Sequence, residues 1–231
     1  MCGRFSQQRP TSEIARIFEA EDLAVDEGGH FNVAPTDEAA VVVQRDDRRA
    51  VVRYRWGLIP SWAEPRQASK AFNARAETLA SSGLFRDAFR RRRCLVPADG
   101  FYEWLRVDGT RQPMRIHDPG GEPLALAGLW TGRRDEASGE WQRTFTIVTT
   151  RPNAFMASIH DRMPVVIPRD AWASWLDPTP REPGELRALL EPREDLALAA
   201  YAVVPLVNNV RNDGPELLEP TDPAPAQPSL F

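Results

Sequence analysis

The chain has 231 residues, seven tryptophans and a formal net charge of −4, so it is long enough for one domain or a tight pair of subdomains. A protein that holds nucleic acid by bulk charge is usually basic, so any nucleic-acid contact in this acidic chain must use a local patch. The two cysteines have no short spacing and the three histidines no helical ligand spacing. This pattern excludes a disulfide framework and a Cys-rich zinc site, and we expect no metal and no cofactor.

The first residues, MCGRFSQQRP, lack the apolar segment of a secretory signal, and no apolar run is long enough to span a membrane. We therefore expect a cytoplasmic protein without membrane contact, monomeric by default, in which Cys2 stays a free thiol. Lys70 is the only lysine among the 29 Lys and Arg residues. Codon bias in a GC-rich genome explains this excess of arginine, and the planar Arg fork also suits phosphate contact; the two explanations are compatible.

The first part of the chain predicts one helix and a group of strands. A helix capped by Thr11 or Ser12 runs to about Ala20, because its isoleucines fall on the same face as Phe18. FNVAPT is a short extended piece that ends at Pro35. Residues 39–46 and 49–60 are strand-like and are separated by a turn at 46–48. A polar loop follows from residue 62 to 70, and we expect helical segments near residue 77 and over residues 84–92.

The second part predicts more strands and shorter helices. Residues 94–118 form two strands around an Asp-Gly turn at 108–109. Residues 123–132 and 141–150 form two further strands, with a charged loop over 133–140. A turn or short helix over residues 153–160, helices over 170–176 and 183–190, and a final strand over 196–204 complete the pattern.

Strands in groups with helices interspersed favour an α+β fold over a βαβ array. We expect a single compact domain over residues 1–219, with a mostly antiparallel, curved or barrel-like β-sheet core and flanking helices. Residues 220–231 are rich in proline and poor in core residues, so we expect a disordered tail.

Cys2 stands next to the initiator methionine and is small enough for Met1 to be removed. Removal leaves a 1,2-aminothiol, whose α-amine has a pKa near 8 and is therefore partly neutral at pH 7. Such an amine attacks an aldehyde to give a Schiff base, and the thiol then closes a five-membered thiazolidine ring. The alternative is that residue 2 is Cys by chance.

Three further residues could assist such chemistry, and each has a plainer interpretation. Glu103, among the aromatics of GFYEW, is either a buried acid with a raised pKa or a solvent-facing residue on an alternating strand. His160, in SIHDRMP, is either a proton carrier or a satisfied structural histidine. Asn73, in FNARAET, either fixes the attacking group or serves as a turn or cap residue.

Seven motifs occur in a fixed order: MCGRF, FNVAPT, FNARAET, GFYEW, IVTT, IHDRMP and NNVRNDGPEL. This set resembles the SOS-response-associated peptidase (SRAP) family, the abasic-site processing proteins. The resemblance runs from Met1 to about Glu219 and covers nearly the whole predicted domain.

The resemblance implies four catalytic roles. Cys2 is the nucleophile that crosslinks to an abasic site after Met1 is lost, and Asn73 orients it. Glu103 assists the removal of Met1 and proton transfer. His160 assists opening of the abasic sugar and Schiff-base chemistry, and it supports reversal of the crosslink.

The resemblance also implies a binding face for single-stranded DNA, made of Arg4, Pro35, Trp62, Arg75, Thr149 and Arg162. The arginines hold phosphates, the proline wedges against the DNA, and the aromatic ring suits stacking with unpaired bases. The chain departs from the pattern at Ala63, where some members have a second Trp, and at Gly83, where some have an Arg. Both departures weaken the expected DNA contact and leave the chemistry untouched.

The tail ends in Gln227, Leu230 and Phe231, a pattern that resembles the peptide by which bacterial proteins bind the sliding clamp. Together these features predict a bacterial, nucleoid-associated protein that caps abasic sites in single-stranded DNA through a thiazolidine, with some lyase activity at the Schiff-base stage. Two alternatives stay open: an N-terminal-Cys hydrolase (a peptidase or amidase), and a DNA-binding module without a covalent step.

Overall fold

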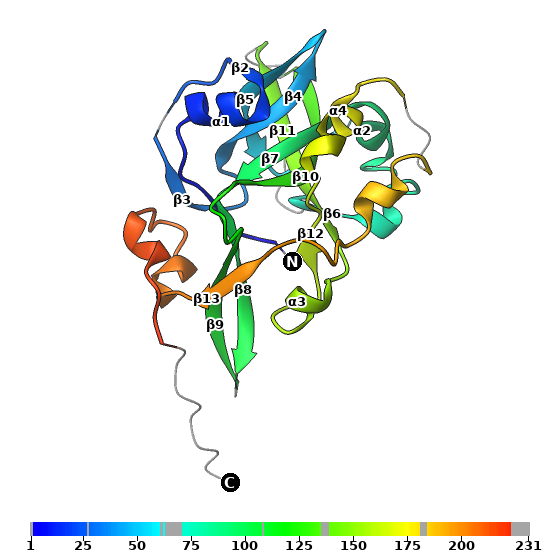
Figure 1. The fold of residues 1–231 in the computed structure, drawn as a ribbon. Helices are drawn as coiled ribbons and strands as arrows, with labels where there is room; N and C mark the ends of the chain where they lie inside the picture. Colours follow the sequence, from blue (N-terminus) through cyan, green and yellow to red (C-terminus); the bar gives the residue numbers. More distant parts are fainter. Residues whose placement is uncertain are drawn as a thin grey trace.

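The computed structural model describes residues 2–26, 28–60, 62, 71–107, 109–134, 139–180 and 184–222. It confirms the α+β prediction, because a closed β-barrel is joined to a second sheet and carries only short helices (Figure 1). The terminal tail from residue 223, with its proposed clamp-binding residues, lies outside the described residues.

Five strands form the barrel in the neighbour order β11, β10, β7, β4, β5, and a parallel pairing of β5 with β11 closes it. Their bounds are β4 (Glu38–Arg45), β5 (Arg48–Trp56), β7 (Arg93–Ala98), β10 (Leu124–Arg134) and β11 (Trp141–Thr150). In β4, Val41 and Val43 belong to one buried cluster, and Val42 belongs to another. Because both of its faces are buried, β4 reads as a continuous apolar run rich in β-branched residues.

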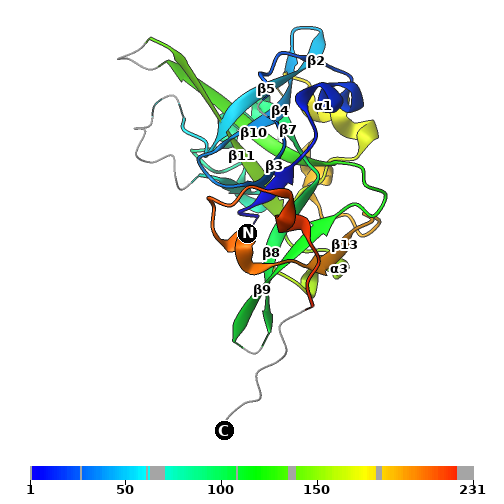
Figure 2. The same cartoon turned by 90° about the vertical axis from the view of Figure 1, so that its left-hand side faces the viewer.

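The second sheet has the order β13, β9, β8, β1, β3. Its strands are β1 (Phe5–Gln7), β3 (His30–Val33), β8 (Gly100–Val107), β9 (Thr110–His117) and β13 (Ala199–Ala202). The predicted hairpin around the Asp-Gly turn is confirmed as β8 and β9. Figures 1 and 2 show this hairpin extending away from the barrel.

The stretch from Cys94 to Val107, predicted as one strand, is two strands in different sheets, and this prediction was wrong. The break is at Asp99, whose carboxylate accepts the backbone N–H of Gln8 at 2.5 Å and whose own N–H donates to Ser6 O at 2.8 Å. Hydrogen bonding to β1 therefore turns the chain out of the barrel and into the second sheet.

The remaining elements are short. The strands are β2 (Ala20–Asp22), β6 (Asn73–Arg75) and β12 (Met163–Pro164). The helices are α1 (Thr11–Phe18), α2 (Arg86–Arg91), α3 (Ala154–Ala157) and α4 (Trp172–Leu176). The 3₁₀ turns are η2 (Ala76–Thr78), η3 (Arg169–Ala171), η4 (Arg187–Leu190), η5 (Pro205–Asn208) and η6 (Pro215–Leu218). Among the described residues no helix combines the length and apolar character needed to cross a bilayer.

Two helix predictions were wrong in detail. The segment near residue 77 is only a 3₁₀ turn, because β6 keeps the preceding residues in the sheet. The described part of the segment over 183–190 has one 3₁₀ turn, from which Leu186 and Leu190 are buried in the core. The expected side-chain cap of α1 is also absent: Pro10 occupies the N-cap, and Thr11 Oγ1 donates to Asp22 Oδ2 at 2.9 Å instead.

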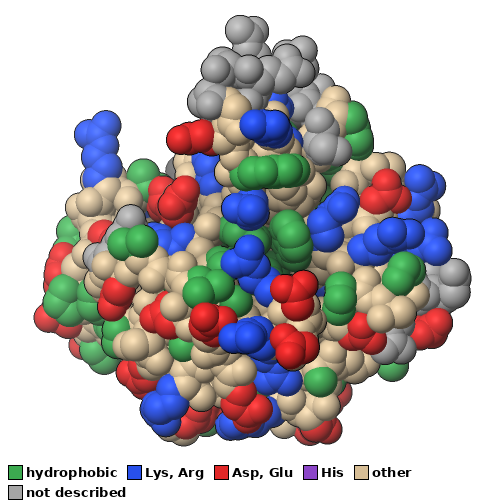
Figure 3. Space-filling view, turned by 90° about the horizontal axis from the view of Figure 1, so that it is seen from above, with side chains coloured by type: hydrophobic (Ala, Val, Ile, Leu, Met, Phe, Trp, Pro, Cys, Tyr) green, Lys and Arg blue, Asp and Glu red, His purple; other side chains and the backbone are tan. Residues whose placement is uncertain are grey.

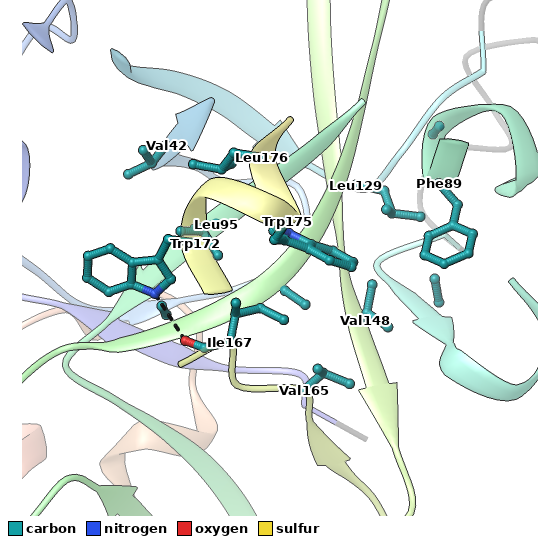
Figure 4. Close-up of a cluster of buried hydrophobic side chains, with 14 of the residues drawn as sticks. Val42, Phe89, Leu95, Leu129, Val148, Val165, Ile167, Trp172, Trp175 and Leu176 are labelled. Carbon is teal, nitrogen blue, oxygen red and sulfur yellow. Dashed lines mark hydrogen bonds between the residues drawn. The ribbon is translucent and has the colours of Figure 1, made fainter. Parts of the chain in front are cut away.

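The larger core cluster lies between the barrel and its helices (Figure 4). Trp172 stacks on Phe18 of α1, with ring centroids 4.4 Å apart, and its Nε1 donates to Ile167 O at 3.0 Å. Trp175 is fully buried and donates from Nε1 to Cys94 O at 2.8 Å. The two indoles of α4 therefore fix this helix to the barrel by packing and by hydrogen bonds.

The replacement Trp175→Ala is expected to lower the free energy of unfolding by about 3–5 kcal/mol, because it leaves a cavity and an unpaired carbonyl in the core. The control is Trp141→Ala, since this indole is 60% exposed and its loss changes stability little. Urea denaturation measures both. Equal small effects of the two variants would show that α4 does not contribute to the cooperative core.

Candidate functional site

Cys2 is fully buried and belongs to the cluster that fills the barrel interior. The chain enters this position just before β1, which holds the following residues in the second sheet by pairing with β3 and β8. Burial, together with the nearby Glu103 carboxyl, raises the pKa of the Cys2 thiol well above its usual range. The thiol is therefore kept as neutral S–H.

Asn73 holds the backbone of Cys2. Its Nδ2 donates to Cys2 O at 2.8 Å. Asn73 begins β6, which runs parallel to β11 with Asn73 opposite Ile147. The sheet register therefore places this amide where it fixes residue 2 without touching its thiol.

Glu103 is buried, with only 3% of its side chain exposed. Both faces of β8 are covered here: Phe101 packs in the barrel cluster, and Tyr102 packs against the C-terminal 3₁₀ turns. The interpretation of Glu103 as a solvent-facing residue on an alternating strand is therefore wrong. Burial raises the pKa of Glu103 from its usual 4.5 to about 7, which suits a group that gains and loses a proton near neutral pH.

His160 follows α3, whose N-cap Asn153 accepts the N–H of Met156 at 2.9 Å. Its Nε2 lies 3.5 Å from Glu103 Oε2. Burial lowers the pKa of His160 below its usual 6.5, so the neutral imidazole dominates at pH 7. The imidazole and the buried carboxyl thus form an acid–base pair beside Cys2.

The tautomer of His160 follows from its neighbours. Nδ1 accepts the backbone N–H of Arg162 at 3.0 Å, while Asp161 Oδ1 lies 2.9 Å from the same nitrogen. The contact with Arg162 requires Nδ1 without a proton, whereas a hydrogen bond to Asp161 would require Nδ1 to carry one. The Asp161 side chain is almost fully exposed and screened by solvent, whereas the backbone N–H is fixed, so we assign the ring proton to Nε2, on the side of Glu103.

Three of the expected DNA-binding residues lie on adjacent segments beside this pair. β6 and β12 both pair with β11, so that Thr149 is opposite Arg75 on one edge and Pro164 on the other. Arg162, just before β12, donates from Nη2 to Thr149 O at 2.7 Å and makes a two-pronged ion pair with Glu77. Sequence reasoning missed Glu77, although it stands within the FNARAET motif.

The other three expected DNA-binding residues, Arg4, Pro35 and Trp62, lie in different structural settings. Arg4 uses its guanidinium within the fold, donating from Nη1 to Asn32 Oδ1 at 2.9 Å and to Val207 O at 2.7 Å. Pro35 starts a tight turn in which Thr36 has a φ of 86°, a conformation that a β-branched residue adopts only under constraint. Trp62 is 69% exposed, so its ring is available for stacking.

Arginines are not confined to this region. Figure 3 looks from above onto the barrel end with the tips of β4, β5, β10 and β11, where arginine side chains lie beside acidic and hydrophobic ones. Near this end Arg143 lies over the ring of Trp141, 6.0 Å from its centroid. Basic surface alone therefore does not locate the site, and the buried acid–base pair does. Within the described residues no group of three or more His, Cys, Asp or Glu is arranged to hold a metal.

The raised pKa of Glu103 has a consequence for stability. Below the unfolded pKa the carboxyl is protonated in both states, and above about pH 7 folding must bury its charge. Stability is therefore lost as the pH rises from about 4.5 to 7. We expect Glu103→Gln to stabilise the protein at pH 8 relative to the parent, and this advantage to shrink by about 2 kcal/mol at pH 5. Thermal denaturation at the two pH values measures it, with Glu38→Gln on the surface as the control; a pH-independent difference would contradict a raised pKa.

Comparisons with known proteins identify the family of the chain. The family model of the SOS response associated peptidase (SRAP) matches residues 1–210. The abasic site processing protein YoqW of Bacillus subtilis is 38% identical over 223 residues, which cover 95% of this chain and 99% of that protein. YedK of Escherichia coli, also named an abasic site processing protein, is 30% identical over 240 residues, covering 95% of this chain and all of that protein.

Solved structures share the fold. A crystal structure of a Bordetella bronchiseptica protein superposes with a TM-score of 0.75 at 28% identity, covering 88% of this chain and 100% of that chain. One from Bacteroides thetaiotaomicron reaches a TM-score of 0.84 at 24% identity over 95% of this chain and 100% of that chain. The resemblance seen in the ordered motifs is confirmed, and the chain belongs to the SOS response associated peptidase (SRAP) family.

Proposed function

We propose that this protein processes abasic sites in single-stranded DNA and caps them with a covalent thiazolidine formed by Cys2 after removal of Met1. The observation that carries the proposal is the position of residue 2: its carbonyl is held by Asn73 at 2.8 Å, beside a buried carboxyl whose pKa is about 7. Relatives named abasic site processing proteins at 30–38% identity support the same substrate.

The first step needs a neutral amine. After Met1 is removed, with Glu103 assisting the proton transfer, the α-amine of Cys2 attacks C1′ of the ring-opened deoxyribose and forms a C–N bond. The resulting carbinolamine loses its hydroxyl as water, and the proton for this leaving group comes from the pair of Glu103 and His160. The product is an imine between residue 2 and the sugar.

The second step closes the ring. Sγ of Cys2 adds to the imine carbon, and the electron pair of the C=N bond takes the thiol proton onto nitrogen. Water is thus the only group lost between the aldehyde and the thiazolidine. Closure removes the imine that would otherwise permit β-elimination, so the cap protects the strand, and lyase activity is confined to the Schiff-base stage.

The protonated state of the Cys2 thiol favours this order of steps over the mechanism of a cysteine hydrolase. A cysteine hydrolase needs a thiolate, and burial raises the pKa of the Cys2 thiol so that S–H persists at neutral pH. In the proposed sequence the amine attacks first and the neutral thiol adds second. A self-directed peptidase step, the removal of Met1, remains part of the proposal.

The DNA face combines arginines with an exposed aromatic. Arg75 and Arg162 lie on either side of Thr149, and Trp62 offers an open ring. Phosphate contacts of this kind position a strand without reading its sequence, and stacking tolerates any base. A few such contacts suffice in an acidic monomer that acts on nucleoid DNA.

Replacement of Cys2 separates the two steps. Cys2→Ala keeps a small residue, so Met1 is still removed and the amine remains. We expect no stable adduct with single-stranded DNA carrying one abasic site on a denaturing gel, but a band that borohydride traps, together with increased strand cleavage. Cys94→Ala, a second buried cysteine outside the site, keeps the parent adduct. Mass spectrometry showing Met1 retained on the active protein would refute the mechanism.

The tail proposal is tested separately. We propose that Gln227, Leu230 and Phe231 dock into the bacterial sliding clamp, because apolar anchors at the end of a chain suit a groove. A chain lacking residues 227–231 is expected to lose clamp binding in surface plasmon resonance while crosslinking abasic DNA at the parent rate. Unchanged clamp binding would remove this partner.

A further inference from the structure

Both terminal nitrogens of the Arg162 guanidinium donate hydrogen bonds within the protein. Nη1 donates to Glu77 Oε1 at 2.6 Å and Nη2 to Glu77 Oε2 at 3.0 Å, a two-pronged pair. Nη2 also donates to Thr149 O at 2.7 Å. The Arg162 side chain is 15% exposed and that of Glu77 is 49% exposed. An expected phosphate-binding residue is thus already bound to an anion, at the rim of the candidate site.

Glu77 lies within the field of a second arginine. It stands two residues after Arg75, in the 3₁₀ turn η2 that follows β6. The hydrogen bond from Arg162 is the main cause of the lowered pKa of Glu77, and the charge of Arg75 adds to it. Glu77 is therefore bound by Arg162 and lies within the electrostatic field of Arg75. The Arg fork binds carboxylate and phosphate with the same parallel pair of N–H donors.

We propose that Glu77 is an internal phosphate mimic, which occupies the phosphate position beside the candidate site until the backbone of a bound abasic strand displaces it. The proposal rests on the proposed function and adds a specificity-determining residue to it. A strand gains the Arg162 contact only by breaking an existing ion pair. Undamaged DNA has no aldehyde for Cys2 to capture, so for it the exchange of Glu77 for phosphate yields little net binding free energy.

The exchange leaves the acid–base pair in place. Arg162 keeps its bond to Thr149 O, and its backbone N–H still donates to His160 Nδ1 at 3.0 Å. Nη1, which donates to Glu77 Oε1 at 2.6 Å, becomes the atom that meets the phosphate. Arg162 can therefore change its anion without moving His160.

A cavity beside Glu77 provides space for its displaced side chain. A cavity of about 290 Å³ is lined by Glu77, Thr150, Arg151 and Arg187 among others. Arg151 pairs there with Glu191 at 3.0 Å. The lining therefore offers a displaced Glu77 carboxylate the guanidinium groups of Arg151 and Arg187, next to the apolar side chains of Phe89 and Leu190.

The test uses the full chain and undamaged oligothymidylate of about 16 nucleotides, with affinity measured by fluorescence anisotropy from 50 to 200 mM salt, about the range over which phosphate contacts show. In the parent, a phosphate that replaces Glu77 gives no net release of counterions. In Glu77→Gln the phosphate meets a free arginine, so the slope of log K against log salt steepens by about 0.7. Affinity at low salt rises several-fold, and the preference for abasic over undamaged DNA falls.

Two further variants supply the controls. Glu191→Gln neutralises another carboxylate of the same cavity with the same change in net charge, and it leaves the slope unchanged. Combining Glu77→Gln with Arg162→Gln removes the gain, because the released arginine is gone. Crosslinking of abasic DNA by the parent is measured in parallel. If the parent forms no crosslink, the proposed function is contradicted, whereas the affinity comparison remains valid.

A Glu77→Gln protein with an intact melting transition and an unchanged or shallower salt slope overturns the proposal and leaves Glu77 as a scaffold for Arg162. If that variant does not fold, Glu77→Asp, which keeps the charge but is too short for the two-pronged pair, is measured instead. It is expected to bind undamaged DNA more tightly than the parent. Equal or weaker binding overturns the proposal as well.

Discussion

The backbone of β11 is the constraint on which the rest of the molecule depends. One edge of this strand pairs with β10 and then with β12, and the other edge pairs with β5 and then with β6. The β5 pairing closes the barrel, whereas the β6 and β12 pairings fix Asn73, Arg75 and the segment with His160. A shift of register along β11 would therefore open the barrel and separate the site residues at once.

The second theme is the use of burial to tune chemistry. Glu103 carries a carboxyl that most folds leave exposed, and here it lies in the interior together with the thiol of Cys2. Burial pushes the pKa of the carboxyl toward neutrality and keeps the thiol protonated. The same desolvation lowers the pKa of His160. One physical cause thus sets three protonation states that suit amine attack followed by thiol addition.

Sequence patterns predicted the long strands well and the short elements poorly. β4, β5, β10 and β11 each span eight or more residues, enough for an apolar pattern to show. β2, β6 and β12 have three residues or fewer, and they exist only because a partner strand lies beside them. For the site, motifs indicated Cys2, Asn73, Glu103 and His160 as a set. They could not reveal the pair of Glu77 with Arg162, because its partners are 85 positions apart.

The hydrogen bonds that join Arg4 and Asn32 to residues 207–212 bear on how the protein folds during synthesis. The Arg4 guanidinium donates to Val207 O, 203 positions along the chain, and Asn32 binds the same C-terminal turn through Asn209 O and Asn212 O. During synthesis the N-terminus leaves the ribosome long before these carbonyls, which lie about 200 residues later in the chain. These contacts to the segment that contains Cys2 therefore form only after residues 207–212 have been made. An incomplete chain would present residue 2 to the cell without the surroundings that direct its reactivity.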